Sequence, residues 1–284
     1  MSRTGVIDHA TALTEAPRRS VLLRMLPPGL YAGRSLVMME RAGLVYRRSW
    51  MLVLSGFFEP LFYLLSFGAG LAPLVGGVHG PNGEPLTYAQ YIAPALLASS
   101  AMNGAIADST INVFQKLKFA KLYDGILATS LGPVDVALGE ITWALSRGGL
   151  YAIGFVVVMV VMHLIISPWA LMLIPVALLV ALGFAAVGMA TTTFMRNFQD
   201  LQLLYLVTLP MFLFSGTFYG LNVYPVWLRF LVELMPLQHG VVLLRSLTVG
   251  DINAGLLWHA GYFAAMAIGG LWLTSRRLTV LLLS

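Results

Sequence analysis

The ionisable side chains inside the long apolar stretches of this sequence are the residues best placed to do chemistry. Glu59 lies in the first stretch, about 13 Å along a helix that begins near Trp50. Asp108 and Arg147 lie toward the same end of the second and third stretches, so we expect an ion pair between them. Glu140 precedes Arg147 by two helical turns, too far for a direct pair on one helix. For Glu59 two interpretations remain, a protonated carboxyl that bonds a neighbouring helix or a group that gates or contacts a substrate.

Enzyme signatures are missing from the sequence. It has no Gly-x-x-x-x-Gly-Lys-Ser/Thr loop for ATP phosphates and no Gly-x-Ser-x-Gly frame for a serine nucleophile. The five histidines lack the spacing of metal ligands, and the sequence has no cysteine. We therefore expect no catalytic site, no metal site and no cofactor bound by this chain.

The composition is that of a membrane protein. Hydrophobic residues make up 58% of the chain and charged residues only 10%, whereas soluble domains carry about 25% charged residues. The pI near 9.6 does not indicate nucleic acid, because the basic residues flank apolar runs and form no separate basic domain. They are expected to face anionic membrane lipids.

Apolar runs long enough to cross the hydrocarbon core of a membrane, about 30 Å thick, occur six times. They are residues 51–73, 91–113, 138–166, 169–194, 201–220 and 254–275. Lysines and arginines gather in the N-terminal segment and in alternate gaps between the runs. The positive-inside rule then places both termini in the cytoplasm. The sequence thus predicts an all-α, multi-pass protein of the cell membrane.

Residues 1–29 are expected to be a mobile cytoplasmic tail, and residues 30–284 a single membrane domain. Arg34, Arg41 and Arg48 recur every seven residues and therefore share one helix face. This pattern predicts an amphipathic helix over 30–50 that lies in the membrane interface. The alternative is an ordinary cytoplasmic extension of the first span.

The longest cytoplasmic connection, residues 114–134, alternates basic and apolar side chains. A loop that only reverses direction would be shorter and more polar. A short helix that docks on a partner protein explains the pattern, and contact with lipid alone explains it equally well. The candidate docking residues are Lys116, Lys118, Lys121, Tyr123 and Asp124.

The outer connection, residues 221–253, is too apolar for an ordinary loop. Its two apolar runs, 226–235 and 237–248, are too short to span a membrane and are separated by Pro236. We expect a broken helical hairpin that re-enters the outer leaflet between spans five and six.

Aromatic residues are numerous in the first and fifth runs. They could pack helices or line a path for a lipid or sugar chain, because rings pack on acyl groups and stack on sugars. Both runs are also candidates for a seam between two copies of the protein. The candidate path residues are Phe57, Phe62, Tyr63, Tyr205, Phe212 and Phe214.

Four strings, in order along the chain, resemble ABC-2 type exporter permeases. They are Glu59–Pro60 with the Leu-Phe-Tyr-Leu-Leu-Ser-Phe-Gly that follows, the 24 residues Lys-Leu-Tyr-Asp-Gly-Ile-Leu-Ala-Thr-Ser-Leu-Gly-Pro-Val-Asp-Val-Ala-Leu-Gly-Glu-Ile-Thr-Trp-Ala from Lys121, Thr208–Tyr219 and Met235–Arg245. The branch that looks most similar is the permease of nodulation-factor (lipo-chitooligosaccharide) exporters, with daunorubicin exporter permeases more distant. One departure is Ser130, where similar proteins often have proline.

The resemblance implies six spans, a cytoplasmic coupling helix near Phe114–Thr129 and outer re-entrant helices. It also implies a pair of permease chains, identical or related, that work with two ABC ATPase subunits, which hold the ATP and Mg. The leading hypothesis is thus a permease that exports a hydrophobic or lipid-linked substrate, such as a glycolipid or a drug-like molecule. The alternative is a proton-coupled secondary transporter that uses Glu59, Asp108 and Arg147. A membrane-embedded enzyme would need a polar cluster that the sequence lacks.

Overall fold

The computed structural model of the chain describes residues 50–75, 77–80, 83–127 and 132–283. The expected cytoplasmic tail and all but the last residue of the expected interfacial helix lie outside these ranges. So does the end of the expected coupling segment, beyond residue 127.

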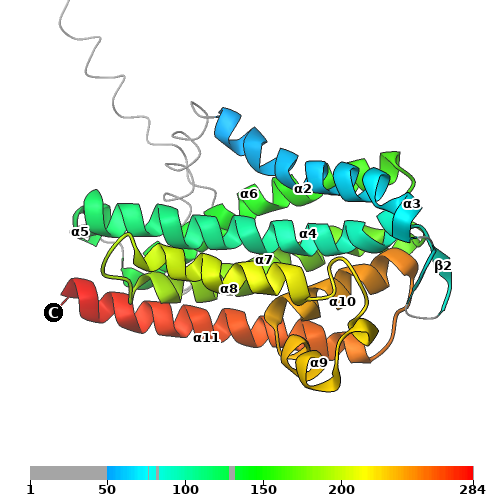
Figure 1. Ribbon diagram of the computed structural model, residues 1–284. Coiled ribbons are helices and arrows are strands. Elements are labelled where there is room, and N and C mark those ends of the chain that lie inside the picture. Colours follow the sequence, from blue (N-terminus) through cyan, green and yellow to red (C-terminus); the bar gives the residue numbers. More distant parts are fainter. Residues whose placement is uncertain (1–49, 76, 81–82, 128–131, 284) are drawn as a thin grey trace, which may run out of the picture.

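Long helices dominate the structure and run side by side in a bundle (Figure 1). They are α2 (Trp50–Gly70), α4 (Tyr88–Ala107), α6 (Pro133–Val161), α7 (Leu173–Thr192), α8 (Asp200–Phe214) and α11 (Gly255–Leu283). Each overlaps one of the six apolar runs. By length and composition, three of the described segments can cross a membrane, namely Asp135–Val161, Pro168–Thr192 and Gly255–Leu281. Such segments are what a membrane-embedded, multi-pass protein requires.

The fifth apolar run forms a shorter helix than the sequence predicted. We expected a span over 201–220, but α8 ends at Phe214 after 15 residues, fewer than the roughly 20 that a spanning helix needs. Gly216 follows with a φ of 70°, a left-handed conformation that glycine adopts readily. The backbone leaves the helical path there, which the apolar composition of the run did not reveal.

The connections gather at two opposite ends of the bundle (Figure 1). One end holds α5 (Leu122–Leu127) and the C-terminal end of α11, and we call it the elbow end after the turn that precedes α5. The opposite end, which we call the hairpin end, holds α3 (Ala72–Val75) and α9 (Val226–Glu233). It also holds a short antiparallel ladder of β1 (Val78–His79) with β2 (Pro85–Leu86). The ladder is a small exception to the all-α prediction.

Close packing around α7 forms the centre of the bundle, where α7 contacts α4, α6 and α11. A Cβ atom at Gly270 of α11 would lie 2.5 Å from the carbonyl carbon of Ala186 on α7. Likewise, a Cβ at Gly183 would lie 2.8 Å from Cδ1 of Phe263. Among lipid tails, helices are held together by such close contacts rather than by exclusion of water, which explains the small residues here.

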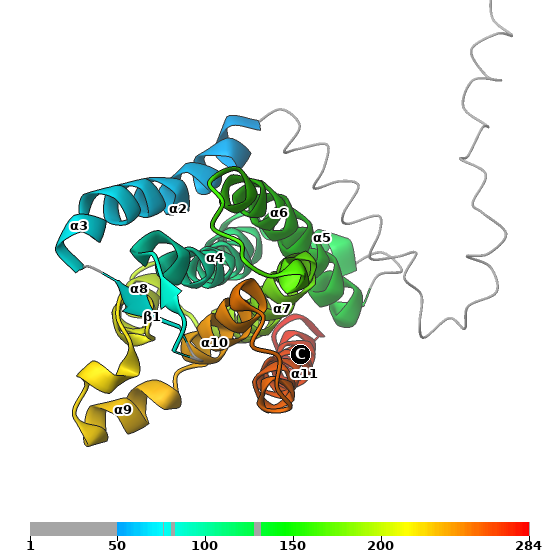
Figure 2. The same ribbon diagram turned by 90° about the vertical axis from the view of Figure 1, so that its right-hand side faces the viewer.

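Two helices lie at the periphery, next to α4 (Figure 2). α2 contacts α4 and α6, and α8 contacts α10 (Pro236–Val249). Only Leu201 and Met211 of α8 are buried, so most of this apolar helix is exposed in a single chain. The exposed apolar surface of α8 must therefore face lipid or another protein.

The outer connection forms two helices that meet at a sharp bend. α9 and α10 lie at 82° to each other. Pro236 begins α10, a position at which its missing N–H needs no partner. The expected boundaries, 226–235 and 237–248, agree closely with these helices. Most of α10 is buried in the bundle, whereas α9 exposes Trp227 and Phe230.

Candidate functional site

A cavity of about 450 Å³ lies between α2, α4, α6 and α8. Cavities of about 300–1,000 Å³ commonly bind small molecules in proteins. Leucines, isoleucines and Phe212 form its apolar wall. Its polar lining comes from all four helices and comprises Glu59, Tyr63, Ser99, Ser100, Asn103, Thr110, Arg147, Tyr151, Tyr205 and Thr208.

The cavity brings together several residues that the sequence singled out from distant runs. Glu59 and Tyr63 come from α2, Arg147 from α6, and Tyr205 and Phe212 from α8. Tyr63 and Phe212 also pack on each other, with ring centroids 5.7 Å apart. The expected path residues thus belong in part to a real cavity.

Other expected path residues lie elsewhere. Phe62 is exposed on the outer surface of α2, and Phe214 packs on Tyr224 with ring centroids 6.0 Å apart. Neither lines the cavity. The Phe57 side chain is outside the described part of the structure.

Sequence reasoning missed the polar face that α4 presents to the cavity. Ser99 and Asn103 lie four residues apart, one turn along α4, and both line the cavity together with Ser100. Ser99 donates a hydrogen bond to the carbonyl of Ala95 at 2.9 Å, so part of its polarity is satisfied within the helix. In the sequence, two polar residues at helical spacing inside an otherwise apolar run indicate such a face.

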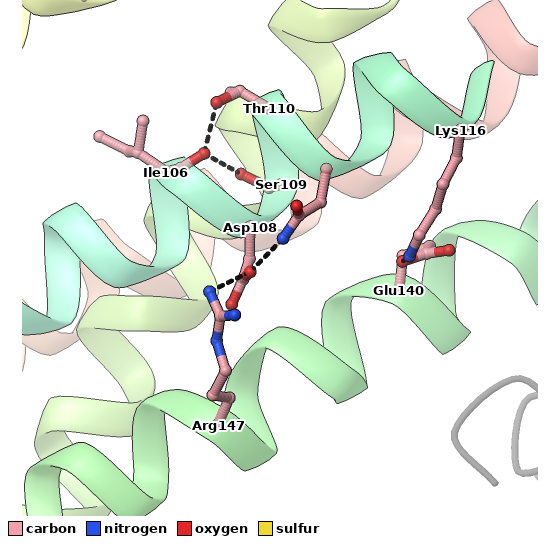
Figure 3. A network of polar contacts seen from close by, with 8 residues as sticks. Ile106, Asp108, Ser109, Thr110, Lys116, Glu140 and Arg147 are labelled. Atoms are coloured by element: carbon pink, nitrogen blue, oxygen red, sulfur yellow. Dashed lines mark hydrogen bonds and ion pairs between the residues drawn. The ribbon is translucent and has the colours of Figure 1, made fainter. Parts of the chain in front are cut away.

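The ion pair expected between Asp108 and Arg147 is present (Figure 3). It joins Oδ1 of Asp108, in a π-helical segment that continues α4, to Nη2 of Arg147 on α6. Nδ2 of Asn112 donates to the same carboxylate oxygen at 2.6 Å. Only 13% of the Arg147 side chain and 5% of the Asp108 side chain are exposed. Arg147 therefore reaches the cavity wall with a carboxylate close enough to offset its charge.

A second ion pair also joins the π-helical continuation of α4 to α6 (Figure 3). Nζ of Lys116 lies 2.6 Å from Oε2 of Glu140 on α6. Lys116 was expected to dock on a partner, and Glu140 was expected only to be too far from Arg147. Instead, the π-helical continuation of α4, which includes Gln115–Phe119, carries Lys116 alongside α6. Lys116 thus acts within the chain in this structure.

The helical path turns sharply at the elbow, which we define as residues 118–124. Lys121 has a φ of 45°, which is uncommon for a residue other than glycine and separates the π-helical segment from α5. Lys118, Lys121 and Asp124 are exposed, and Phe119 is 70% exposed. The elbow therefore presents two cations, an anion and a bare ring at one end of the bundle.

Tyr123 is a correction to the expected docking set. Its side chain is fully buried and belongs to the hydrophobic core. The turn at Lys121 points Tyr123 inward while leaving its neighbour Asp124 outside. Tyr123 therefore anchors the elbow to the bundle and offers no surface to a partner.

Phe114, four residues before the elbow, packs on the connection between α7 and α8. Phe114 is buried against Met195 and Leu201. Asp200, one residue before the expected fifth span, accepts hydrogen bonds from the backbone N–H groups of Arg196 at 2.7 Å and Asn197 at 3.1 Å. These bonds to the charged carboxylate lower the pKa of Asp200. A displacement of the elbow would therefore reach α8 as well as α6.

A buried arginine ties α10 to the rest of the hairpin end. Arg245 donates from Nη2 to the carbonyl of Gly216 at 2.8 Å and from Nε to the carbonyl of Tyr91 at 3.3 Å. Its guanidinium carbon also lies 3.8 Å from the centroid of the Tyr91 ring. This arginine fixes the bent pair of helices onto the start of α4. Within the described residues, no group of three histidine, aspartate or glutamate side chains could hold a metal ion.

Comparison with known proteins gives a consistent family match. The profile of the family described as ABC-2 type transporter matches residues 35–249. A protein named Nodulation protein J from Rhizobium leguminosarum bv. trifolii is 30% identical over 207 residues, which is 72% of this chain and 76% of that protein.

Two further proteins of the same name are similar. The one from Rhizobium leguminosarum bv. viciae is 28% identical over 213 residues, covering 74% of this chain and 79% of that protein. The one from Rhizobium meliloti (strain 1021) is 27% identical over 221 residues, covering 76% and 81%.

Proposed function

The chain belongs to the ABC-2 type transporter family, and we propose that it is the permease subunit of an exporter driven by a separate ABC ATPase. Its place in this family makes it a transmembrane component, and ATP hydrolysis belongs to the partner. In the proposed arrangement the chain crosses the membrane six times, and the fifth crossing combines the short helix α8 with the residues that follow it, up to 220. The elbow end faces the cytoplasm, and the hairpin end faces outward.

The observation that carries this proposal is the exposed elbow. Aromatic residues, phenylalanine among them, are enriched in protein interfaces, where a polar rim surrounds them. The elbow lies at the same end of the bundle as the C-terminal end of α11 (Figure 1), which is the end that the positive-inside rule assigns to the cytoplasm. An ATPase that docks here could use Lys118, Lys121 and Asp124 for ion pairs and Phe119 as an apolar anchor.

Contacts behind the elbow supply a route by which its movement would reach the cavity. The Lys116–Glu140 pair joins the preceding segment to α6, and the Asp108–Arg147 pair joins the same elements at the cavity wall. Phe114 contributes an apolar contact to the connection before α8. Three of the four helices that form the cavity are thus attached to the elbow, so a shift of the elbow would change the shape of the cavity.

A second permease chain, identical or related, would complete the membrane unit. The exposed surface of α8 includes Tyr205 and Leu206, and the nearby α2 exposes Phe58 and Phe62. Together these side chains form an apolar face suited to a partner in the membrane, where close packing drives helix association. Tyr205 belongs to this exposed surface and also lines the cavity, so a second chain packed here would shield the cavity from lipid.

The α9–α10 pair supports an outward exit for a hydrophobic or lipid-linked cargo. In our proposal it re-enters the outer leaflet, with Trp227 and Phe230 of α9 in contact with lipid. Helical hydrogen bonds satisfy most of its backbone groups, and Arg245 of α10 donates to the carbonyls of Gly216 and Tyr91 in the neighbouring segments. The pair would then cap the outer end of the pathway.

The direct test of this proposal is whether ATP or a proton gradient drives export. The chain would be reconstituted in vesicles with the ABC ATPase that co-purifies with it. Export of two fluorescent cargoes, a lipid-linked oligosaccharide and a drug-like amphiphile, would be measured. We expect export to stop when the ATPase carries a substitution of its catalytic glutamate, and to continue with a protonophore. Export that follows a proton gradient and ignores ATP would instead support the secondary transporter.

A further inference from the structure

The charge on the cavity wall is set by a single acidic residue. Of the residues that line the cavity, all of them in the described part of the chain, Glu59 and Arg147 are the charged ones. Arg147 is paired with Asp108, so its charge is largely offset. Within the described residues the Glu59 carboxylate has neither an ion pair nor a hydrogen bond, and the wall carries a net negative charge.

Aromatic residues line the same cavity as Glu59. Tyr63 follows one turn later on α2, and Tyr205 and Phe212 come from α8 across the cavity. Ring faces attract cations through the quadrupole of their π electrons, and the attraction is larger where water is excluded. A cavity lined by a carboxylate and several rings has the groups that recognise an ammonium or a similar cation.

The rest of the wall is mixed, with leucines and isoleucines from α4 and α8 beside the polar side chains of Ser99, Asn103 and Thr208. A ligand that fills the cavity can therefore be amphiphilic, with an apolar body and a polar group. An anionic ligand would face the uncompensated Glu59, and the one cation on the wall is already engaged by Asp108. The cavity thus disfavours anions, and a cation gains an attraction to the Glu59 carboxylate that a neutral ligand lacks.

We propose that this cavity binds an amphiphilic cation, with the Glu59 carboxylate as its counter-ion. The site selects cargo by charge, and aromatic contacts hold the apolar body of the ligand. This inference names the substrate class of the cavity and rests on the proposed export function only for the direction in which the cation moves.

Two ions of matched shape and opposite charge test this directly. The full chain would be placed in nanodiscs of phosphatidylcholine, which has no net charge, and equilibrium binding of tetraphenylphosphonium and tetraphenylborate would be measured. Binding to empty nanodiscs is subtracted for each ion. Glu59→Gln should weaken tetraphenylphosphonium binding at least about tenfold, or about 1.4 kcal/mol, because the bound cation loses its counter-ion. Tetraphenylborate binding should stay unchanged or become tighter.

A matched control and a conservative variant separate charge from structure. Glu233→Gln removes the same charge at the exposed end of α9, where Glu233 pairs with Arg229, and should leave the binding of both ions unchanged. Glu59→Asp keeps the charge and should retain most of the tetraphenylphosphonium binding. An equal loss of both ions in Glu59→Gln, or no loss of the cation, would overturn the proposal.

A measurement on the unmodified chain covers the case in which Glu59→Gln does not fold. A hydrophobic carbodiimide modifies carboxyl groups in membrane proteins, and mass spectrometry would give the rate at Glu59. Tetraphenylphosphonium should slow this modification, and tetraphenylborate should not. Equal protection by both ions, or none by either, would refute the site. Neither result bears on ATP-driven export, which is measured separately, so failure here leaves the proposed function standing.

Discussion

The ion pair between Arg147 and Asp108 makes a quantitative prediction about stability. With side chains 13% and 5% exposed, both groups have lost most of their contact with water. Removing one partner from a buried pair costs about 3–5 kcal/mol, and a lone charge in a membrane span costs at least about 2.5 kcal/mol by insertion scales. We therefore expect Arg147→Ala to lower the free energy of unfolding by about 3 kcal/mol.

The double variant should be more stable than Arg147→Ala alone. Asp108→Asn removes the charge that Arg147→Ala leaves unpaired. It also keeps an oxygen that can accept the hydrogen bond from Asn112, now 2.6 Å long. The double variant should regain at least about 1 kcal/mol of the free energy of unfolding that Arg147→Ala loses. This exceeds the ~0.5 kcal/mol by which the effects of independent sites deviate from a sum.

Reversible unfolding in mixed micelles, followed by tryptophan fluorescence, would give the four free energies of this cycle. Arg229 and Glu233 provide a matched control, because their side chains are 54% and 47% exposed and pair four residues apart on one helix. Their coupling energy should be only about 0.3–0.5 kcal/mol. If the effects of Arg147→Ala and Asp108→Asn simply add, the pair contributes nothing and the reasoning is wrong.

Three further predictions concern the elbow, the buried arginine and the outer hairpin. Lys118→Glu combined with Lys121→Glu should abolish co-purification of the ATPase while the chain still inserts and folds; intact co-purification would exclude the elbow as the docking surface. Arg245→Met should lower the free energy of unfolding by about 3 kcal/mol, since two buried carbonyls lose a charged donor; a loss below about 1 kcal/mol in the same unfolding assay would contradict this. The chain has no cysteine, so single cysteines can probe the hairpin with a membrane-impermeant maleimide. Val241 is buried in any case, whereas Leu231 is exposed and should be spared only if α9 lies in the membrane, so rapid labelling at 231 would rule out re-entry.

The positions of the helices and one ion pair could be predicted from the sequence. Apolar runs locate helices because a span must satisfy its backbone internally and face lipid with apolar side chains. Asp108 and Arg147 were predictable partners because each lies near the same end of neighbouring spans, where an unpaired charge is costly. The prolines around 225–236 likewise marked the bend between α9 and α10.

Contacts that depend on local helix geometry could not be predicted. The continuation of α4 as π-helical segments, Asp108–Asn112 and Gln115–Phe119, rotates the residues that follow relative to a regular helix. It therefore places Lys116 against Glu140, and no spacing in the sequence indicates that pairing. The burial of Tyr123 follows from the positive φ of Lys121, a conformation that sequence patterns do not predict for lysine.

α6 connects the proposed ATPase-docking elbow to the proposed cation-binding cavity, and separate variants test the two sites. Glu140, which is tied to the segment before the elbow, and Arg147, on the cavity wall, lie two turns apart on one continuous helix. A movement of the elbow would therefore shift the wall that faces Glu59. Changes at the exposed elbow lysines should remove ATPase docking and leave the binding of a cation intact, because these residues lie outside the cavity. Changes at Glu59 should remove cation binding and leave ATPase docking intact, because Glu59 lies in the cavity and outside the elbow. If elbow variants lost cation binding without unfolding, elbow and cavity would form one cooperative unit, and the charge on the wall could not be assigned to Glu59 alone.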